Sequence, residues 1–307
     1  MPINNFSIIQ ESVLKNIKTT SQDFQRVFHG RSYLYEGYDF LVIDSIDRVL
    51  QVAYFKEISK DLEASLMALF KTINEMNCYE AIVLQRRYLS KAPKEVLFGT
   101  LPEEIFAYEE GMKFLLNLND NQNNGFFGDM KVGRKFVREH AQGLNVLNLF
   151  SYTCSFSVAA LMGGAKHVVN VDMSKKSLEV GRKNHQLNML KKGTFSFMPY
   201  NILKSWSRIK KAGPYDFIII DPPSLQKGSF ASTTDYQKII RRMKELSGEN
   251  CMVLAALNNP SLDTRFLINI FAEHAPEFKF QKRLDNLETY PSKEEERSLK
   301  NLIFIKG

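Results

Sequence analysis

The chain has few of the residues that build disulfide or metal frameworks. Its 307 residues include three cysteines, Cys78, Cys154 and Cys251, an odd number without CxxC spacing. This count and spacing argue against a disulfide scaffold and against a structural zinc site. We therefore predict a protein without a metal site that keeps its thiols reduced, as in the cytoplasm.

The sequence also lacks the segments that direct a chain to a membrane. It has no apolar run long enough to cross a bilayer. Residues 1–5 show neither the basic region nor the apolar region of a signal peptide. We expect no membrane association. The chain instead has a surplus of cations, with a net charge of +7. That surplus favours an anionic partner such as nucleic acid, although an ordinary, mildly basic cytosolic protein explains it equally well.

Helical and strand patterns alternate irregularly over the first third of the chain. We predict a small α+β domain over residues 1–118, followed by a polar linker over residues 119–125. The expected elements are a helical lead over 1–30, a strand pair over 40–46 and 49–55, a helix over 60–76, a strand over 80–85 and two strands within 103–119.

From residue 126 onward, strands alternate with helices. Such alternation predicts an α/β domain with a mostly parallel sheet, here over residues 119–307. The expected helices cover 126–142, the stretch after 150 to 161, and 175–190, and the expected strands cover 145–150, 167–172, 195–198, 217–220, 252–257 and 302–305.

The most informative motif is Asp-Phe-Ile-Ile-Ile-Asp-Pro-Pro at residues 216–223. Its apolar part predicts a buried strand, and Asp221 then stands at the carboxyl end, where open α/β sheets bind ligands. Pro222 and Pro223 fix the backbone and donate no N–H. Their carbonyls and the carboxylate therefore form a stiff lip that could hold the amino edge of a flat ring.

A second motif follows the strand over residues 145–150. The turn at 150–155 has small residues but no glycine, which argues against a dinucleotide pyrophosphate and suits a cofactor without phosphate. Asp172, after the next strand, can accept both ribose hydroxyl protons, or it could merely cap the helix that begins near Ser174. Asn201 and Ile202, after the third strand, could hold adenine, or the asparagine could serve only the turn.

Together these residues resemble the class I S-adenosylmethionine-dependent methyltransferases, and more narrowly the bacterial large-subunit ribosomal RNA methyltransferases that modify cytosine carbon-5 or guanine nitrogen-7. The motifs that carry the resemblance lie at residues 124–130, 147–153, 172–174 and 221–224. The resemblance implies a Rossmann-like domain with a seven-stranded, mostly parallel sheet, preceded by a small α+β accessory domain that could bind RNA. It also implies that the cofactor is S-adenosyl-L-methionine and that the partner is RNA, namely ribosomal RNA.

The resemblance assigns roles to individual positions. Asp221, Pro222, Pro223 and Asn258 would orient the acceptor base. The residues that would contact the cofactor are Phe126, Asp129, Arg134, Asn148, Phe150, Tyr152, Phe156, Asp172, Met173, Asn201, Ile202 and Asp221.

The cysteine positions bear on which atom is methylated. Carbon-5 of a pyrimidine requires attack by a thiolate, so a cysteine must stand at the carboxyl edge of the sheet. Asn258 and Asn259 end the fifth strand instead, whereas Cys251 begins it and Cys154 lies in the cofactor turn. We therefore predict direct transfer to a purine nitrogen, guanine favoured. The asparagine pair could equally be only a turn before Pro260.

Other readings remain open at this point. The basic, aromatic segment 85–94 could contact RNA or be a solvated face, and residues 28–31 could contact RNA or pack the two domains together. The acceptor could be a small molecule or a protein side-chain amide. The protein could also be a non-catalytic RNA-binding factor, because Cys154 and Ser155 stand where the family usually has a glycine. The sequence leaves monomer and homodimer undecided.

Overall fold

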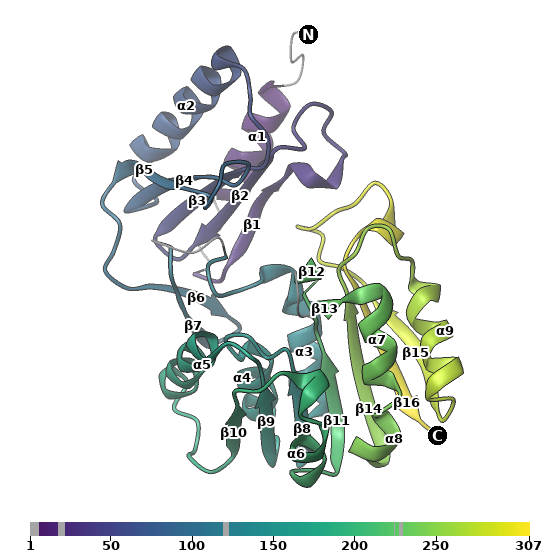
Figure 1. Cartoon of the computed structure of the whole chain (residues 1–307). Coiled ribbons are helices and arrows are strands. Elements are labelled where there is room, and N and C mark those ends of the chain that lie inside the picture. The colour runs from purple at the N-terminus through teal and green to yellow at the C-terminus, as the bar shows by residue number, and fades with distance from the viewer. Residues whose placement is uncertain (1–5, 18–21, 119–122, 224, 227–229) are drawn as a thin grey trace. The chain divides into compact units, whose positions relative to one another are not determined.

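A computed structural model describes residues 6–17, 22–118, 123–223, 225–226 and 230–307 (Figure 1). The chain forms two compact units. Unit 1 comprises residues 1–128 and 287–293, and unit 2 comprises residues 129–286 and 294–307. Among the described residues, no helix combines the length and the apolar character that a membrane span requires.

Unit 1 is built on a five-stranded sheet in the order β1-β2-β3-β4-β5. β3 and β4 are parallel and are connected through α2, while the other neighbours are antiparallel. α2 begins where Ser59 accepts the N–H of Leu62, and its apolar stripe is buried against the sheet. The elements are α1 (Phe6–Ile17), β1 (Gln25–His29), β2 (Leu41–Ile46), β3 (Val49–Tyr54), α2 (Lys60–Glu75), β4 (Ala81–Arg86), β5 (Lys94–Gly99) and a separate hairpin of β6 (Ile105–Glu109) and β7 (Met112–Leu116).

The predicted helical lead over residues 1–30 is correct only for α1. Gln25–His29 is a strand in which Val27 and Phe28 are buried. Arg26 of this strand forms an ion pair with Asp44 of the neighbouring strand β2. Two edge strands, β5 and β15 (Phe278–Leu284), were not predicted. Most of their side chains are at least partly exposed, so they lack the apolar pattern by which a buried strand is found.

Unit 2 contains a seven-stranded sheet in the order β10-β9-β8-β11-β14-β16-β15, and β16 alone runs against its neighbours. This confirms the predicted Rossmann-like α/β fold. The strands are β8 (Asn145–Leu149), β9 (His167–Val171), β10 (Phe195–Met198), β11 (Tyr215–Ile220), β14 (Ser247–Leu257), β15 (Phe278–Leu284) and β16 (Lys300–Lys306), and the helices are α3 (Lys131–His140), α4 (Ser155–Met162), α5 (Lys175–Leu187), α6 (Trp206–Lys211), α7 (Ser232–Ile240), α8 (Met243–Leu246) and α9 (Thr264–His274).

Alternate residues of the central strands enter two different cores. Leu147 and Leu149 of β8 pack in one cluster with residues of α7 and α9, and Val146 packs in another with residues of α3 and α4. Both faces of the sheet are therefore covered by helices, which explains the continuous apolar runs. The strand order reverses at β8, between β9 and β11, and ligands bind at such a switch point, beyond the carboxyl ends of the strands.

The boundary between the units lies beyond the position predicted from the sequence. Asn124 exchanges side-chain hydrogen bonds with Gln51, and Phe126 stacks on Phe114 with the ring centroids 5.0 Å apart. These contacts assign the described part of the predicted linker, residues 123–125, to unit 1, whose first segment runs to Gly128 and not to residue 118. Residues 119–122 lie outside the described residues.

Candidate active site at the carboxyl edge of the sheet

The turn after β8 has three non-glycine residues in the left-handed backbone region. The φ angles are 57° at Phe150, 47° at Tyr152 and 64° at Cys154. Each costs on the order of 1 kcal/mol or more, and such strain gathers at functional sites. Backbone hydrogen bonds from Ser151 to Val171 (3.1 Å) and from Cys154 to Ser151 (2.7 Å) hold the turn. The missing glycines therefore do not prevent the turn from forming.

Helix α5 supports this turn from behind. Cys154 is fully buried, and a Cβ atom at Gly181 would lie 2.6 Å from its sulfur. Asn184 donates to the carbonyl of Thr153 at 2.9 Å. Burial raises the pKa of the Cys154 thiol, so this thiol is a packing group.

Asp172 is held against the turn by two backbone N–H groups. Its Oδ2 accepts from Tyr152 and its Oδ1 accepts from Ser174, both at 2.8 Å. The side chain of Ser174 caps α5 by accepting the N–H of Ser177, so Asp172 is not the helix cap. Each carboxylate oxygen keeps a second lone pair, which suits a pair of ribose hydroxyls. Met173, the next residue, is 49% exposed.

Asn201 and Ile202 follow β10 at the same edge. Asn201 begins the short helix Ile202–Lys204, but its side chain makes no capping hydrogen bond there. Ile202 is 5% exposed and packs in the core with Leu149 and Val171. The amide beside an apolar wall fits the edge and face of an adenine ring.

The charged and polar side chains at this edge suit a positively charged nucleoside that has no phosphate group. The acidic groups of this edge are Asp172, Asp221 and Asp129, and the buried Arg134 lies close to Asp221. Carboxylates oppose a pyrophosphate and favour a positive charge such as a sulfonium. S-adenosylmethionine, with its ribose diol, adenine and sulfonium, therefore fits the residues present.

Asn148 belongs to a buried polar network under the site. Its amide donates to Asn170 (2.9 Å), Asn170 donates to Ser157 (3.0 Å), and Ser157 lies 2.9 Å from the Nε2 of His185. Burial lowers the pKa of His185 to about 4, so the ring is neutral. The network links β8, β9, α4 and α5 and so fixes the floor of the turn. A cofactor contact by Asn148 stays a prediction.

The predicted aromatic contacts differ in burial. Phe150 is half-buried in the turn, whereas the side chain of Phe156 is only 5% exposed. The Phe156 ring packs against Gly133, where an added Cβ atom would lie 3.3 Å from the ring. Phe126 belongs to unit 1 and packs on Phe114 and Phe24 there. Their roles toward a cofactor stay predictions.

Asp221 follows β11 and has an unusual protonation equilibrium. Burial, and then the charge of Asp129, raise its pKa to about 7, against a lowering contribution from Arg134. Pro222, the next residue, is buried. Tyr236 of α7 donates its hydroxyl to the carbonyl of Ala256 at 2.7 Å and lies 3.3 Å from that of Ile220. It therefore ties together the carboxyl ends of β14 and β11.

The asparagine pair after β14 divides into two roles. The side chain of Asn259 accepts the N–H of Ser261 at 2.9 Å, which is the turn role that the sequence left open. Asn258 is exposed at the carboxyl end of the strand. The predicted contact of Asn258 with an acceptor base stays a prediction.

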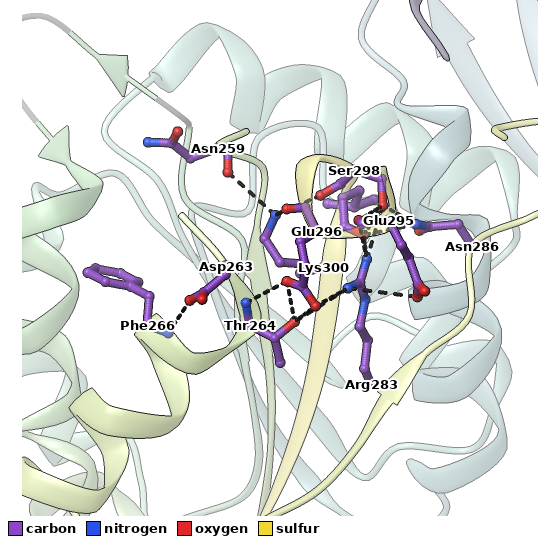
Figure 2. Close-up of polar contacts among 11 residues, drawn as sticks. Asn259, Asp263, Thr264, Phe266, Arg283, Asn286, Glu295, Glu296, Ser298 and Lys300 are labelled. Atoms are coloured by element: carbon purple, nitrogen blue, oxygen red, sulfur yellow. Dashed lines mark hydrogen bonds and ion pairs between the residues drawn. The ribbon is translucent and has the colours of Figure 1, made fainter. Parts of the chain in front are cut away.

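A buried lysine supports this loop (Figure 2). Lys300, at the start of β16, is fully buried, and its Nζ donates to the carbonyls of Glu296 (2.5 Å), Ser298 (2.8 Å) and Asn259 (3.4 Å). Burial, and then the charge of Arg283, lower its pKa to about 8. Arg283 also donates to Glu296 at 3.1 Å, and Glu296 accepts the backbone N–H of Thr264 at 2.7 Å.

A family described as S-adenosylmethionine-dependent methyltransferases matches residues 25–305. The chain belongs to this family. Ribosomal RNA large subunit methyltransferase I of Aeromonas hydrophila is 34% identical over 154 residues, 48% of this chain and 39% of the relative. The protein of the same name from Erwinia tasmaniensis is 33% identical over 189 residues, 58% and 47% of the two chains. The chain thus spans less than half the length of these relatives.

Solved structures agree with the methyltransferase fold. The structure of SMU.776, complexed with SAH, superposes with a TM-score of 0.86 at 23% identity and covers 99% of this chain and 80% of its own. A structure from Streptococcus mutans gives a TM-score of 0.85 at the same identity, covering 97% and 80%. At this identity the likeness establishes the fold.

Sequence reasoning missed two supports of the methyltransferase site. Tyr236 and Lys300 are both fully buried and both bind backbone carbonyls at the carboxyl edge of β14. A single tyrosine in a helix or a single lysine at the start of a strand belongs to no recognisable sequence motif. The sequence feature that could have indicated Lys300 is a charged residue next to an apolar run, here Asn-Leu-Ile-Phe-Ile.

Proposed function

We propose that this methyltransferase transfers the methyl group of S-adenosylmethionine to a purine nitrogen of 23S ribosomal RNA, with guanine favoured. The names of its relatives support a ribosomal RNA substrate. One observation carries the choice of nitrogen. The carboxyl edge of the unit 2 sheet presents Asp221, with a pKa of about 7, while both thiols of unit 2, Cys154 and Cys251, are buried.

The positions of the three cysteines argue against a covalent thiol intermediate. Cys251 is buried, its pKa is raised to about 12 by burial, and it interacts with Asp216 and Lys306 at the opposite edge of the sheet. Cys154 is sealed behind the turn, and Cys78 belongs to unit 1. Methylation at carbon-5 of a pyrimidine would need a thiolate nucleophile, which neither buried thiol of unit 2 supplies.

The residues of the site can do the remaining chemistry. S-adenosylmethionine supplies an electrophilic methyl group when it is bound. When the acceptor is a ring or amino nitrogen that carries a proton, the Asp221 carboxylate accepts a hydrogen bond from that N–H. It takes the proton as the nitrogen bonds to the methyl carbon and the bond between that carbon and the sulfonium sulfur breaks. A base with a pKa near the working pH is suited to this role. Asn258 and the lip carbonyls hold the ring in plane, so orientation supplies part of the rate.

The test is mass spectrometry of the nucleosides from ribosomal RNA of a deletion strain. We expect one methylated guanosine to be missing, to return with the wild-type gene, and to stay missing with Asp221→Ala. A missing 5-methylcytidine would contradict the choice of nitrogen, and an unchanged set of ribosomal marks would contradict the substrate. Because ribosomal RNA is modified where ribosomes assemble, we also propose a cytoplasmic location.

A further inference from the structure

The carboxyl ends of three strands meet at one edge of the unit 1 sheet. β1 and β3 both run antiparallel to β2, and β4 runs parallel to β3. The loops after β1, β3 and β4 therefore leave from the same side. The N–H of Arg87 donates to the carbonyl of Tyr54 at 2.8 Å, which holds two of these loops together. We call the residues Arg31, Tyr33, Phe55, Arg87 and Tyr88 the edge surface.

Two guanidinium groups from different loops converge on one aromatic ring. The Cζ atom of Arg31 lies 4.3 Å from the ring centroid of Phe55, and that of Arg87 lies 5.2 Å away. Arg87 also donates to the side chain of Asn123 at 3.1 Å. Stacking on the ring orients the guanidinium planes, and Arg31 remains exposed to solvent.

Two further basic side chains, Arg26 and His29, lie close to these two arginines. Arg26 contacts Asp44 at 2.5 Å, which compensates its charge, and also donates to Nδ1 of His29 at 2.7 Å. Burial, and then Arg26 and Arg31, lower the pKa of His29 to about 3, so the ring stays neutral. The pKa of Arg87 is lowered by burial and then by Arg31. The fold thus holds like charges together, and a bound anion would relieve their repulsion.

Exposed aromatic rings flank the charged groups. Tyr33 is 56% exposed and Tyr88 is 37% exposed, each close in sequence to one of the stacked arginines. Single-stranded RNA is bound by guanidinium groups on its phosphates and by aromatic or guanidinium planes on its unstacked bases. We propose that the edge surface of unit 1 binds a single-stranded segment of the RNA, an inference that rests on the proposed RNA substrate.

The test compares matched variants of the full chain in binding a labelled single-stranded RNA of mixed sequence. The double variant Arg31→Gln/Arg87→Gln should bind at least about tenfold more weakly, with a salt slope smaller by roughly 1.4 for two lost phosphate contacts. Tyr33→Ala/Tyr88→Ala should weaken binding several-fold at an unchanged slope. Arg48→Gln is the control, because Arg48 is paired with Glu80 at the opposite edge of the same sheet.

Three outcomes would overturn the proposal: wild-type affinity and slope in the double arginine variant, no RNA binding by the wild type, or equal displacement of the RNA by poly-glutamate of matched charge. Arg31→Gln alone changes an exposed side chain and reports the same effect if the double variant does not fold. The analysis of ribosomal RNA from the deletion strain tests the proposed reaction separately. If the wild-type protein binds RNA through the edge surface but deletion of its gene leaves the methylation of ribosomal RNA unchanged, the proposed reaction is wrong and the proposed RNA-binding surface is not contradicted.

Discussion

The backbone N–H of Tyr152 donates to the Oδ2 of Asp172 at 2.8 Å. This single hydrogen bond joins the strained turn after β8 to the carboxylate at the end of β9, so the two predicted cofactor contacts are fixed to each other. The second oxygen of Asp172 is fixed in the same way by Ser174. The carboxylate is therefore oriented before any ligand arrives, which reduces the entropy lost on binding.

We expect Asp172→Ala to weaken S-adenosylmethionine binding by more than tenfold, because two charge-assisted hydrogen bonds to the ribose are lost. Isothermal titration calorimetry measures the change. Ser174→Ala is the matched control. It removes the cap of α5, costs about 1 kcal/mol of stability, and should leave cofactor affinity unchanged. Wild-type affinity in the Asp172 variant would contradict the ribose role.

The raised pKa of Asp221 predicts a pH-dependent rate. Single-turnover methyl transfer at saturating cofactor should rise with pH around a midpoint near 7, because the carboxylate form accepts the proton. Asp129→Asn removes a neighbouring negative charge and should move the midpoint to lower pH. A rate independent of pH between 5 and 9, with chemistry limiting, would rule out this role of Asp221.

The same group predicts a gain of stability on substitution. Because the folded-state pKa of Asp221 lies above its ordinary value of 3.8, ionisation weakens the folded state as pH rises from about 4 to 7. Asp221→Asn should therefore raise the free energy of unfolding at pH 8, by at most about 4 kcal/mol. The gain should shrink toward pH 4, and urea unfolding at both pH values measures it. A gain of equal size at both values would contradict the linkage.

Lys300 should act on turnover through the position of the loop after β14. Lys300→Met leaves three carbonyls without their shared donor and should lower the rate of methyl transfer at least tenfold while cofactor affinity stays the same. Lys306→Met is the control. Lys306 lies at the other end of β16 and donates to Ser247 and Gly248, away from the carboxyl edge. Equal losses in both variants would indicate stability alone.

Serine at Cys251 or Cys154 should leave methyl transfer within about threefold of wild type, because both thiols are buried and protonated. The rate with ribosomal RNA from the deletion strain measures this. An inactive serine variant that still binds cofactor and unfolds at the wild-type temperature would restore the covalent mechanism.

The apolar runs ending in Asp172 and Asp221 determined the parallel sheet and its ligand-binding edge from the sequence alone. A run such as Phe217–Ile220 is long enough for a buried strand and too short for a membrane span. β1 was missed because Gln25–His29 becomes a strand through its pairing with β2, a contact distant in the sequence. The unit boundary was displaced for the same reason, since Asn124 finds its partner at Gln51.

The sequence by itself determined the fold class, the family and the places of Asp172 and Asp221 at the ends of their strands, because these depend on local periodicity and short motifs. Only the tertiary structure decided the pKa of Asp221, the convergence of Arg31 and Arg87 on Phe55, and the support of the β14 loop by Lys300. Burial and charge proximity join residues that are far apart in the chain, and no local pattern encodes them.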